Sequence, residues 1–86
     1  MSAVPAVFIV QPYRATKLGI QAESPIQVQS KAQAKRVAER LAVRRAMVLA
    51  IMQPRDPLSG EYLEPKLIAA HGDPIPEEIA DMERVS

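Results

Sequence analysis

The most informative feature of this sequence is what it lacks: it has no cysteine, one histidine and few aromatic residues. Without cysteine the chain can form neither a disulfide nor a thiolate nucleophile, and it cannot build an ordinary structural zinc site. His71 alone is too little for a metal site, so we predict no metal and no cofactor. Aromatic residues are 3% of the chain, which leaves aliphatic side chains to fill the core.

Long apolar runs and glycine-rich loops are missing as well. The longest apolar run, residues 46–52, has seven residues, whereas a membrane-spanning helix needs about 20. The N-terminal stretch has no basic residues ahead of its short apolar run, which does not fit a secretory signal. The three glycines lie far apart and make no phosphate-binding loop. We therefore expect a soluble cytoplasmic protein with no membrane partner and no small-molecule ligand.

The length and composition fit one small domain. The chain has 86 residues, and its apolar fraction of 48% is typical of a folded protein. We assign residues 1–75 to a single α+β domain and residues 76–86 to an acidic tail. In this tail Ile79, Met82 and Val85 follow one another at helical spacing. The tail is predicted to be either a short helix or disordered, and the sequence leaves both open.

One long periodic element, residues 30–45, organises the chain. Ser30 is a good N-cap and Gln33 stands three residues later, which is the capping-box pattern. The apolar stripe that follows consists of Ala34, Val37, Ala38, Leu41 and Ala42. This spacing predicts a helix from residue 31 to about residue 44, with an alanine-rich face lying close to a sheet. Arg45 stands where the stripe would continue, and because burying an unpaired guanidinium is costly, the helix should end before it.

Four segments have the patterns of β-strands. Residues 6–11 are an apolar run between two prolines, and a turn is expected at residues 13–16. Residues 17–29 alternate apolar and polar side chains around a break at Pro25. Residues 46–52 are apolar on all sides, which fits a buried strand better than the alternative, a helix continuing to residue 52. Residues 61–70 are a more polar edge strand, because a proline lies within them.

These elements assemble as β-β-α-β-β: a four-stranded antiparallel sheet, order 2-1-3-4, with one helix packed on one face. The other face would expose apolar side chains of residues 7–10 and 47–52. A patch of that size needs a cover. Either the tail folds under the sheet or a second copy does, and we favour a homodimer through this open face.

The net charge of +1 hides a strong asymmetry along the chain. Residues 31–45 carry +5 and residues 46–86 carry −5. The basic side chains on the outer face of the helix are Lys35, Arg36, Arg40 and Arg44. This ridge either contacts nucleic-acid phosphates or an acidic partner, or is a solvated surface partly paired with acids of the tail. Scarce aromatic residues and a nearly neutral chain count against nucleic acid.

No arrangement of residues predicts catalysis. His71 and Asp73 have the types of a base and its orienting carboxylate, but the nearest nucleophile in sequence, Ser59, lies beyond a predicted strand. A loop histidine at a strand end is the simpler interpretation. The acids of residues 77–81 are explained as the solvated face of a helix. We therefore predict no catalytic residues and no enzymatic activity.

Three pieces of the sequence resemble a group of short uncharacterised bacterial proteins: FIVQPY at residues 8–13, AERLA at residues 38–42 and DPLSGEY at residues 56–62. The acidic ending after residues 71–73 is similar too. The resemblance implies a β-β-α-β-β fold and a bacterial cytoplasmic origin, and it implies no site residues. We predict a small non-catalytic protein acting through protein–protein contacts, with a nucleic-acid-binding accessory protein as the alternative.

Overall fold

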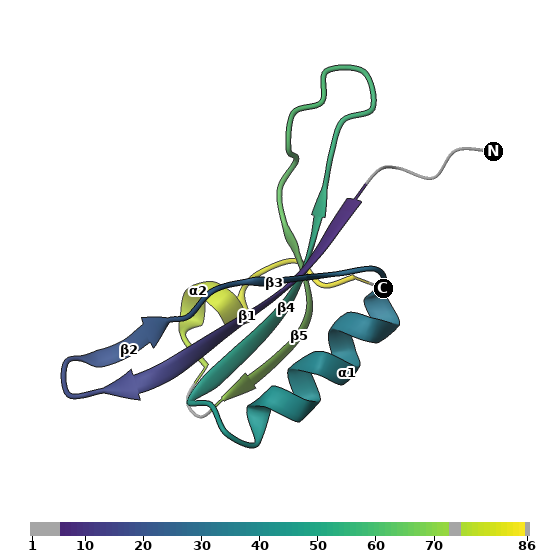
Figure 1. The fold of residues 1–86 in the computed structure, drawn as a ribbon. Helices are drawn as coiled ribbons and strands as arrows, with labels where there is room; N and C mark the ends of the chain where they lie inside the picture. The colour runs from purple at the N-terminus through teal and green to yellow at the C-terminus, as the bar shows by residue number, and fades with distance from the viewer. Residues whose placement is uncertain (1–5, 73–74, 86) are drawn as a thin grey trace.

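A computed structural model describes residues 6–72 and 75–85, which form an open antiparallel sheet of five strands with one main helix (Figure 1). In chain order the elements are β1 (Ala6–Thr16), β2 (Gly19–Ala22), β3 (Ile26–Val28), α1 (Lys31–Ala42), β4 (Met47–Pro54), β5 (Lys66–Gly72) and α2 (Glu77–Ala80). The α+β class predicted from the sequence is confirmed.

The long strand β1 is the axis of the sheet. It pairs with β4 along one edge, from Ala6 opposite Pro54 to Tyr13 opposite Met47. Along its other edge it pairs first with β3 and then with β2. The strand order is β2-β1-β4-β5 with β3 beside β1, so the predicted four-strand order is wrong in one detail. The second strand is two strands, because residues 23–25 leave the ladder at the break that Pro25 predicts.

Most predicted elements occur, with shifted ends. Residues 47–54 are the strand β4, so the predicted strand is confirmed and the alternative helix extension is wrong. The helix α1 ends at Ala42, about two residues earlier than predicted, and Arg44 lies in the turn that follows. The predicted turn at residues 13–16 is wrong, because β1 continues to Thr16 and the chain turns at residues 17–18. The predicted strand at residues 61–70 begins only at Lys66, directly after the proline.

The helix α1 begins with the predicted cap. Ser30 Oγ accepts a hydrogen bond of 3.1 Å from the backbone N–H of Gln33. Gln33 Oε1 in turn accepts from the N–H of Gln29 at 2.8 Å, one residue before the N-cap. Ala34 and Ala38 are fully buried against the sheet, because their small side chains let the helix backbone approach it closely. On this face they join Val10, Val28, Val48, Ala50 and Ile68 in one core cluster.

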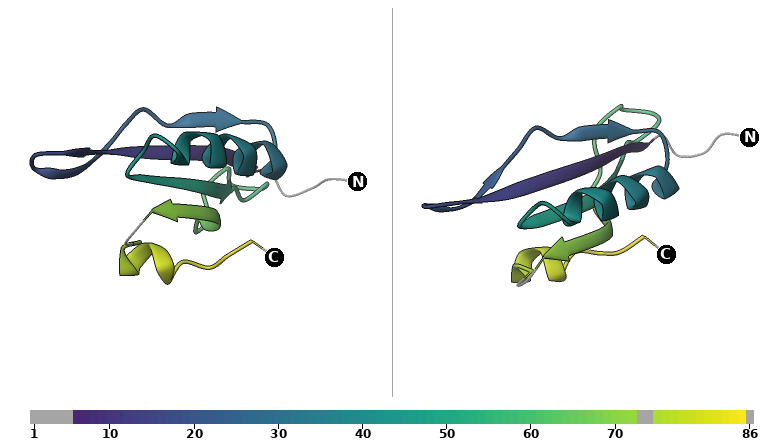
Figure 2. Two further views of the ribbon diagram at one scale, coloured as in Figure 1. Left: turned by 90° about the horizontal axis from the view of Figure 1, so that it is seen from below. Right: turned by 60° about the horizontal axis from the view of Figure 1, so that its bottom comes forward.

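The second face of the sheet is partly covered by the chain end. Ile79 of α2 and Met82 pack against a second core cluster formed by Met47, Leu49 and Leu67. The backbone N–H of Leu67 donates to the carbonyl of residue 83 at 2.8 Å, and the N–H of residue 85 donates back to Leu67 O at 2.9 Å. In both views of Figure 2, β5 lies between α1 and α2. The acidic tail thus contains a short helix, which covers part of β4 and β5, and its residues 83–85 then run along the edge of β5.

Two hairpins project from this body (Figure 1). The first is the β1–β2 turn, where Leu18 is fully exposed and Gly19 has a φ of +124° that other residues rarely adopt. The second is the loop of residues 55–65 between β4 and β5, where Leu58 is 96% exposed. The two projections make the chain 46 Å long but only 23 Å across. Among the described residues, no helix has the length and apolar character needed to cross a membrane.

Candidate functional site

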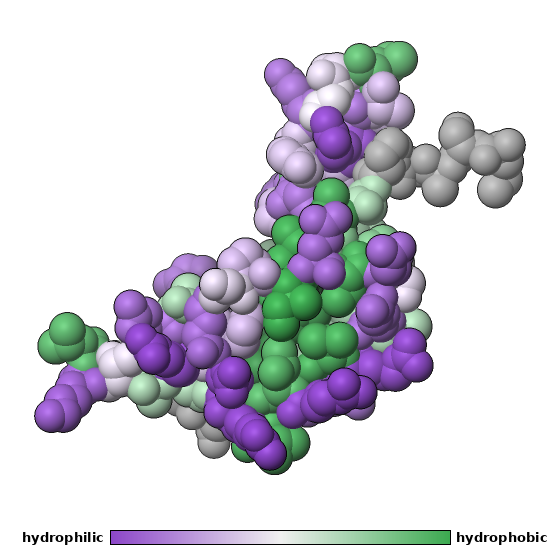
Figure 3. All heavy atoms as spheres, viewed as in Figure 1, coloured by the Kyte–Doolittle hydropathy of each residue, from purple (hydrophilic) through white to green (hydrophobic). Residues whose placement is uncertain are grey.

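A groove lies between α1 and the edge of the sheet at β2 and β3. It has a volume of about 470 Å³ and is lined by Pro12, Arg14, Ala22, Glu23, Ser24, Ile26, Leu41 and Arg45. Figure 3 shows a band of apolar surface beside the hydrophilic outer face of α1 on this side of the molecule. The groove arises because α1 packs over β1, β4 and β5 and leaves the β3 edge uncovered.

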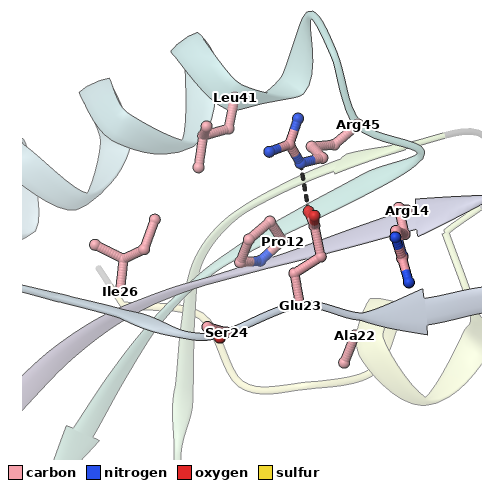
Figure 4. Close-up of a pocket in the computed structure, with 8 residues that line it drawn as sticks. All are labelled: Pro12, Arg14, Ala22, Glu23, Ser24, Ile26, Leu41 and Arg45. Carbon is pink, nitrogen blue, oxygen red and sulfur yellow. Dashed lines mark hydrogen bonds and ion pairs between the residues drawn. The ribbon is translucent and has the colours of Figure 1, made fainter.

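Three apolar residues from three different elements form part of the lining of this groove. In Figure 4, Leu41 of α1 and Ile26 of β3 lie on opposite sides of the opening, and Pro12 of β1 lies to one side of them, next to Glu23. Pro12 is buried, Leu41 is half-buried and Ile26 is 38% exposed. Partly exposed apolar side chains grouped in this way are candidates for contact with another molecule.

One end of the groove is formed by an ion pair between Arg45 and Glu23 (Figure 4). The backbone of Glu23 is fixed to β1: its N–H donates to Pro12 O at 2.9 Å, and Gln11 Nε2 donates to Glu23 O at 2.6 Å. The two charged side chains stay accessible, since Arg45 is 29% and Glu23 28% exposed. This pair explains how Arg45 can follow the apolar stripe of α1 without an uncompensated buried charge.

The basic ridge predicted from the sequence adjoins the groove. Lys35, Arg36 and Arg40 are exposed on α1, and Arg44 is exposed in the turn after it. Arg40 and Arg44 line a second hollow together with Leu41, the residue that also walls the groove. The ion pairs Arg45–Glu23 and Lys66–Glu83 of the described residues do not involve this ridge.

The acids of the tail lie away from the ridge. Glu83 pairs with Lys66 of β5 at 3.2 Å. Glu77, Glu78 and Asp81 are exposed around α2. Within the described part of the chain, no ion pair joins the tail to the ridge. The molecule therefore separates its charge, with cations around α1 and the groove and acids around α2.

The residues considered for catalysis do not come together. His71 lies within β5 opposite Val48, and not in a loop as predicted. Its Nε2 atom is buried and has no hydrogen-bond partner. Asp73 falls outside the described residues, and Ser59 Oγ accepts a hydrogen bond from the backbone N–H of Glu61 in the distant loop. In residues 6–72 and 75–85, no three histidine or acidic side chains gather as a metal site would require.

Sequence reasoning found the ridge but missed the groove beside it. The groove residues Pro12, Glu23 and Ile26 carry no motif, and only the fold brings them to α1. The one available signal was Arg45, whose charge interrupts an apolar stripe and so requires a partner.

Comparison of the chain with protein-family models, with curated proteins and with solved structures gives no match. Function is therefore argued from the groove and the charge around it.

Proposed function

We propose that this chain is a small non-catalytic protein that acts by binding another protein, and that the groove beside α1 is its contact surface. The observation that carries the proposal is the combination at this site of exposed apolar side chains with several arginines. Protein–protein interfaces have this character, with an apolar centre, a polar rim and an enrichment in arginine. A site built only to attract phosphates gains little from apolar walls such as Ile26 and Leu41.

The test is affinity capture with a matched pair of variants. Ile26→Asp places a charge on the exposed wall of the groove, whereas Leu18→Asp places the same charge at the tip of the β1–β2 hairpin. Both side chains are accessible, so both variants should fold. Proteins that the unaltered chain and Leu18→Asp retain, and that Ile26→Asp loses, are partners of the groove. If no captured protein depends on Ile26, the proposal is wrong.

A second copy of the chain remains a candidate partner through the open face of the sheet, as proposed from the sequence. The alternation of β1 places Val7 and Ile9 on that face, where both are half-buried. This surface is smaller than the sequence suggested, because Ile79 and Met82 already cover β4 and β5. Light scattering over a wide concentration range tests the dimer, and a monomer throughout would contradict it.

Nucleic-acid binding is the second candidate function, and the charge separation is what favours it. The cations Lys35, Arg36, Arg40 and Arg44 are exposed and form no ion pair with the described acids of the tail. Binding to a DNA or RNA duplex would weaken steeply with salt and be lost in the double variant Arg36→Ala/Arg40→Ala. Absence of binding at low salt would eliminate this candidate.

A further inference from the structure

The ion pair at the end of the groove indicates which kind of protein segment the groove accepts. We propose that its occupant is an acidic segment with apolar side chains, and that a carboxylate of this segment takes the position at Arg45 that Glu23 holds in the unbound chain. The proposal rests on the proposed function, because it names the chemistry of the protein partner at the same site.

The cation available for this exchange is Arg45. A guanidinium has five N–H donors. The described hydrogen bonds use Nε, toward Glu23, and Nη1, in a long contact of 3.4 Å with Arg44 O. Both partners of the ion pair are more than a quarter exposed, so a carboxylate from solution can reach it. Glu23 is held by its backbone to β1, whereas Arg45 has a long side chain that can turn toward a new partner.

The charge of the surroundings favours an acidic occupant. Arg14 lines the groove beside Arg45, and Arg40 and Arg44 line the adjoining hollow. Glu23 is the single acid among the residues that line these two concave surfaces. A negatively charged segment therefore meets more cations than anions, which speeds its association and fixes its orientation.

Because Ile26 and Leu41 line the groove, we expect the bound segment to carry apolar side chains as well. Ile26 of β3 and Leu41 of α1 line the groove from opposite sides (Figure 4). Only an apolar side chain entering between them removes their surface from water and gains affinity from doing so. Phosphates cannot supply this contact, and the groove has no aromatic side chain on which a base would stack.

The experiment measures binding of three labelled twelve-residue peptides to the full chain by fluorescence anisotropy. The first contains glutamate and leucine in equal number, the second has glutamine in place of glutamate, and the third has serine in place of leucine. The first should bind at least about tenfold more tightly than either of the others. The second lacks the carboxylates that would pair with Arg45, and the third lacks the apolar side chains that would contact Ile26 and Leu41.

Variants at the ion pair separate exchange from a merely structural role. Glu23→Gln removes the competing carboxylate and should tighten binding of the glutamate–leucine peptide by about three- to tenfold. Arg45→Gln should weaken it by about tenfold, Arg45→Lys should retain most of it, and Lys17→Gln at the hairpin tip should leave it unchanged. Thermal melting of each variant establishes that it is folded.

Two results would overturn the inference. If Glu23→Gln is folded but weakens the peptide, Glu23 only builds the wall of the groove. If the glutamine peptide binds as well as the glutamate one, the segment need not be acidic. In that second case the proposed function survives, provided that Ile26→Asp abolishes binding of the glutamine peptide as well. A peptide-binding site unaffected by Ile26→Asp would count against the proposed function itself.

Discussion

Replacing Met82 with alanine tests whether the chain end covers the second face of the sheet. Met82 is half-buried against the cluster that contains the fully buried Leu67. Truncating a fully buried methionine to alanine costs about 2–5 kcal/mol, so a half-buried one should cost about 1–2.5 kcal/mol. For a chain of this size, that loss lowers the melting temperature by about 4–20 °C. Differential scanning calorimetry or circular dichroism measures the shift.

The matched control for this prediction is Glu78→Ala, on the exposed side of α2. It removes a favourable charge from the first turn of a short helix and should change the free energy of unfolding by less than about 0.5 kcal/mol. If Met82→Ala and Glu78→Ala have the same melting temperature, the prediction is wrong, since Met82 would then contribute no packing in solution. The second face would then be open, and the case for a homodimer through it would strengthen.

Three further substitutions probe α1 and the turns. Ala38→Leu should destabilise the fold by about 1–3 kcal/mol in urea unfolding by forcing α1 off the sheet, whereas Ala32→Leu on the exposed side should not; equal effects would contradict the close packing. Ser30→Ala should cost about 0.5–2 kcal/mol in the same assay through loss of the N-cap, and no change would mean that the cap is not formed. Gly72→Ala should lower the melting temperature more than Gly19→Ala. Both glycines have a positive φ, so both substitutions strain the backbone. At Gly72 the added Cβ would also lie 3.1 Å from a neighbouring side-chain carbon, whereas at Gly19 nothing lies within 4 Å. Equal shifts would contradict that crowding.

The sequence predicted those elements whose signals are local. Ser30 marked the start of α1, and the seven apolar residues after Arg45 gave the buried strand β4. The ends of strands were predicted less well, because they depend on pairing with residues elsewhere. The β1–β2 hairpin continues to Thr16 through ladder pairs such as Arg14 with Gln21, although its side chains there are exposed and show no apolar pattern. A hairpin turn at residues 17–18 was signalled only by Gly19, whose positive φ the turn requires.

The candidate site, too, was predicted only in part: the ridge was found from the sequence and the groove was not. The members of the ridge lie within nine residues of each other on or beside one helix, so their helical spacing was enough to group them. The groove takes its walls from β1, β3 and α1, and no spacing in the sequence predicts that Pro12, Ile26 and Leu41 meet. Arg45 follows α1 at the point where the apolar stripe would continue, which predicted the end of the helix, and in the fold its charge is paired with Glu23.

The path of the tail determines whether the basic surface is available to a partner. The hydrogen bonds between Leu67 and the backbone of residues 83 and 85 fix the end of the tail along the edge of β5, where Leu67 forms a parallel bridge with Arg84. Ile79 packs α2 on the face of the sheet opposite α1, and packed layers are spaced by about 10 Å, so the acids of α2 lie about 20 Å from α1. The Debye length at physiological salt is about 8 Å, and the acids are therefore largely screened from the ridge. A net charge of +1 consequently understates the field at Arg36, Arg40 and Arg44, and an anionic partner approaching α1 meets a local excess of positive charge.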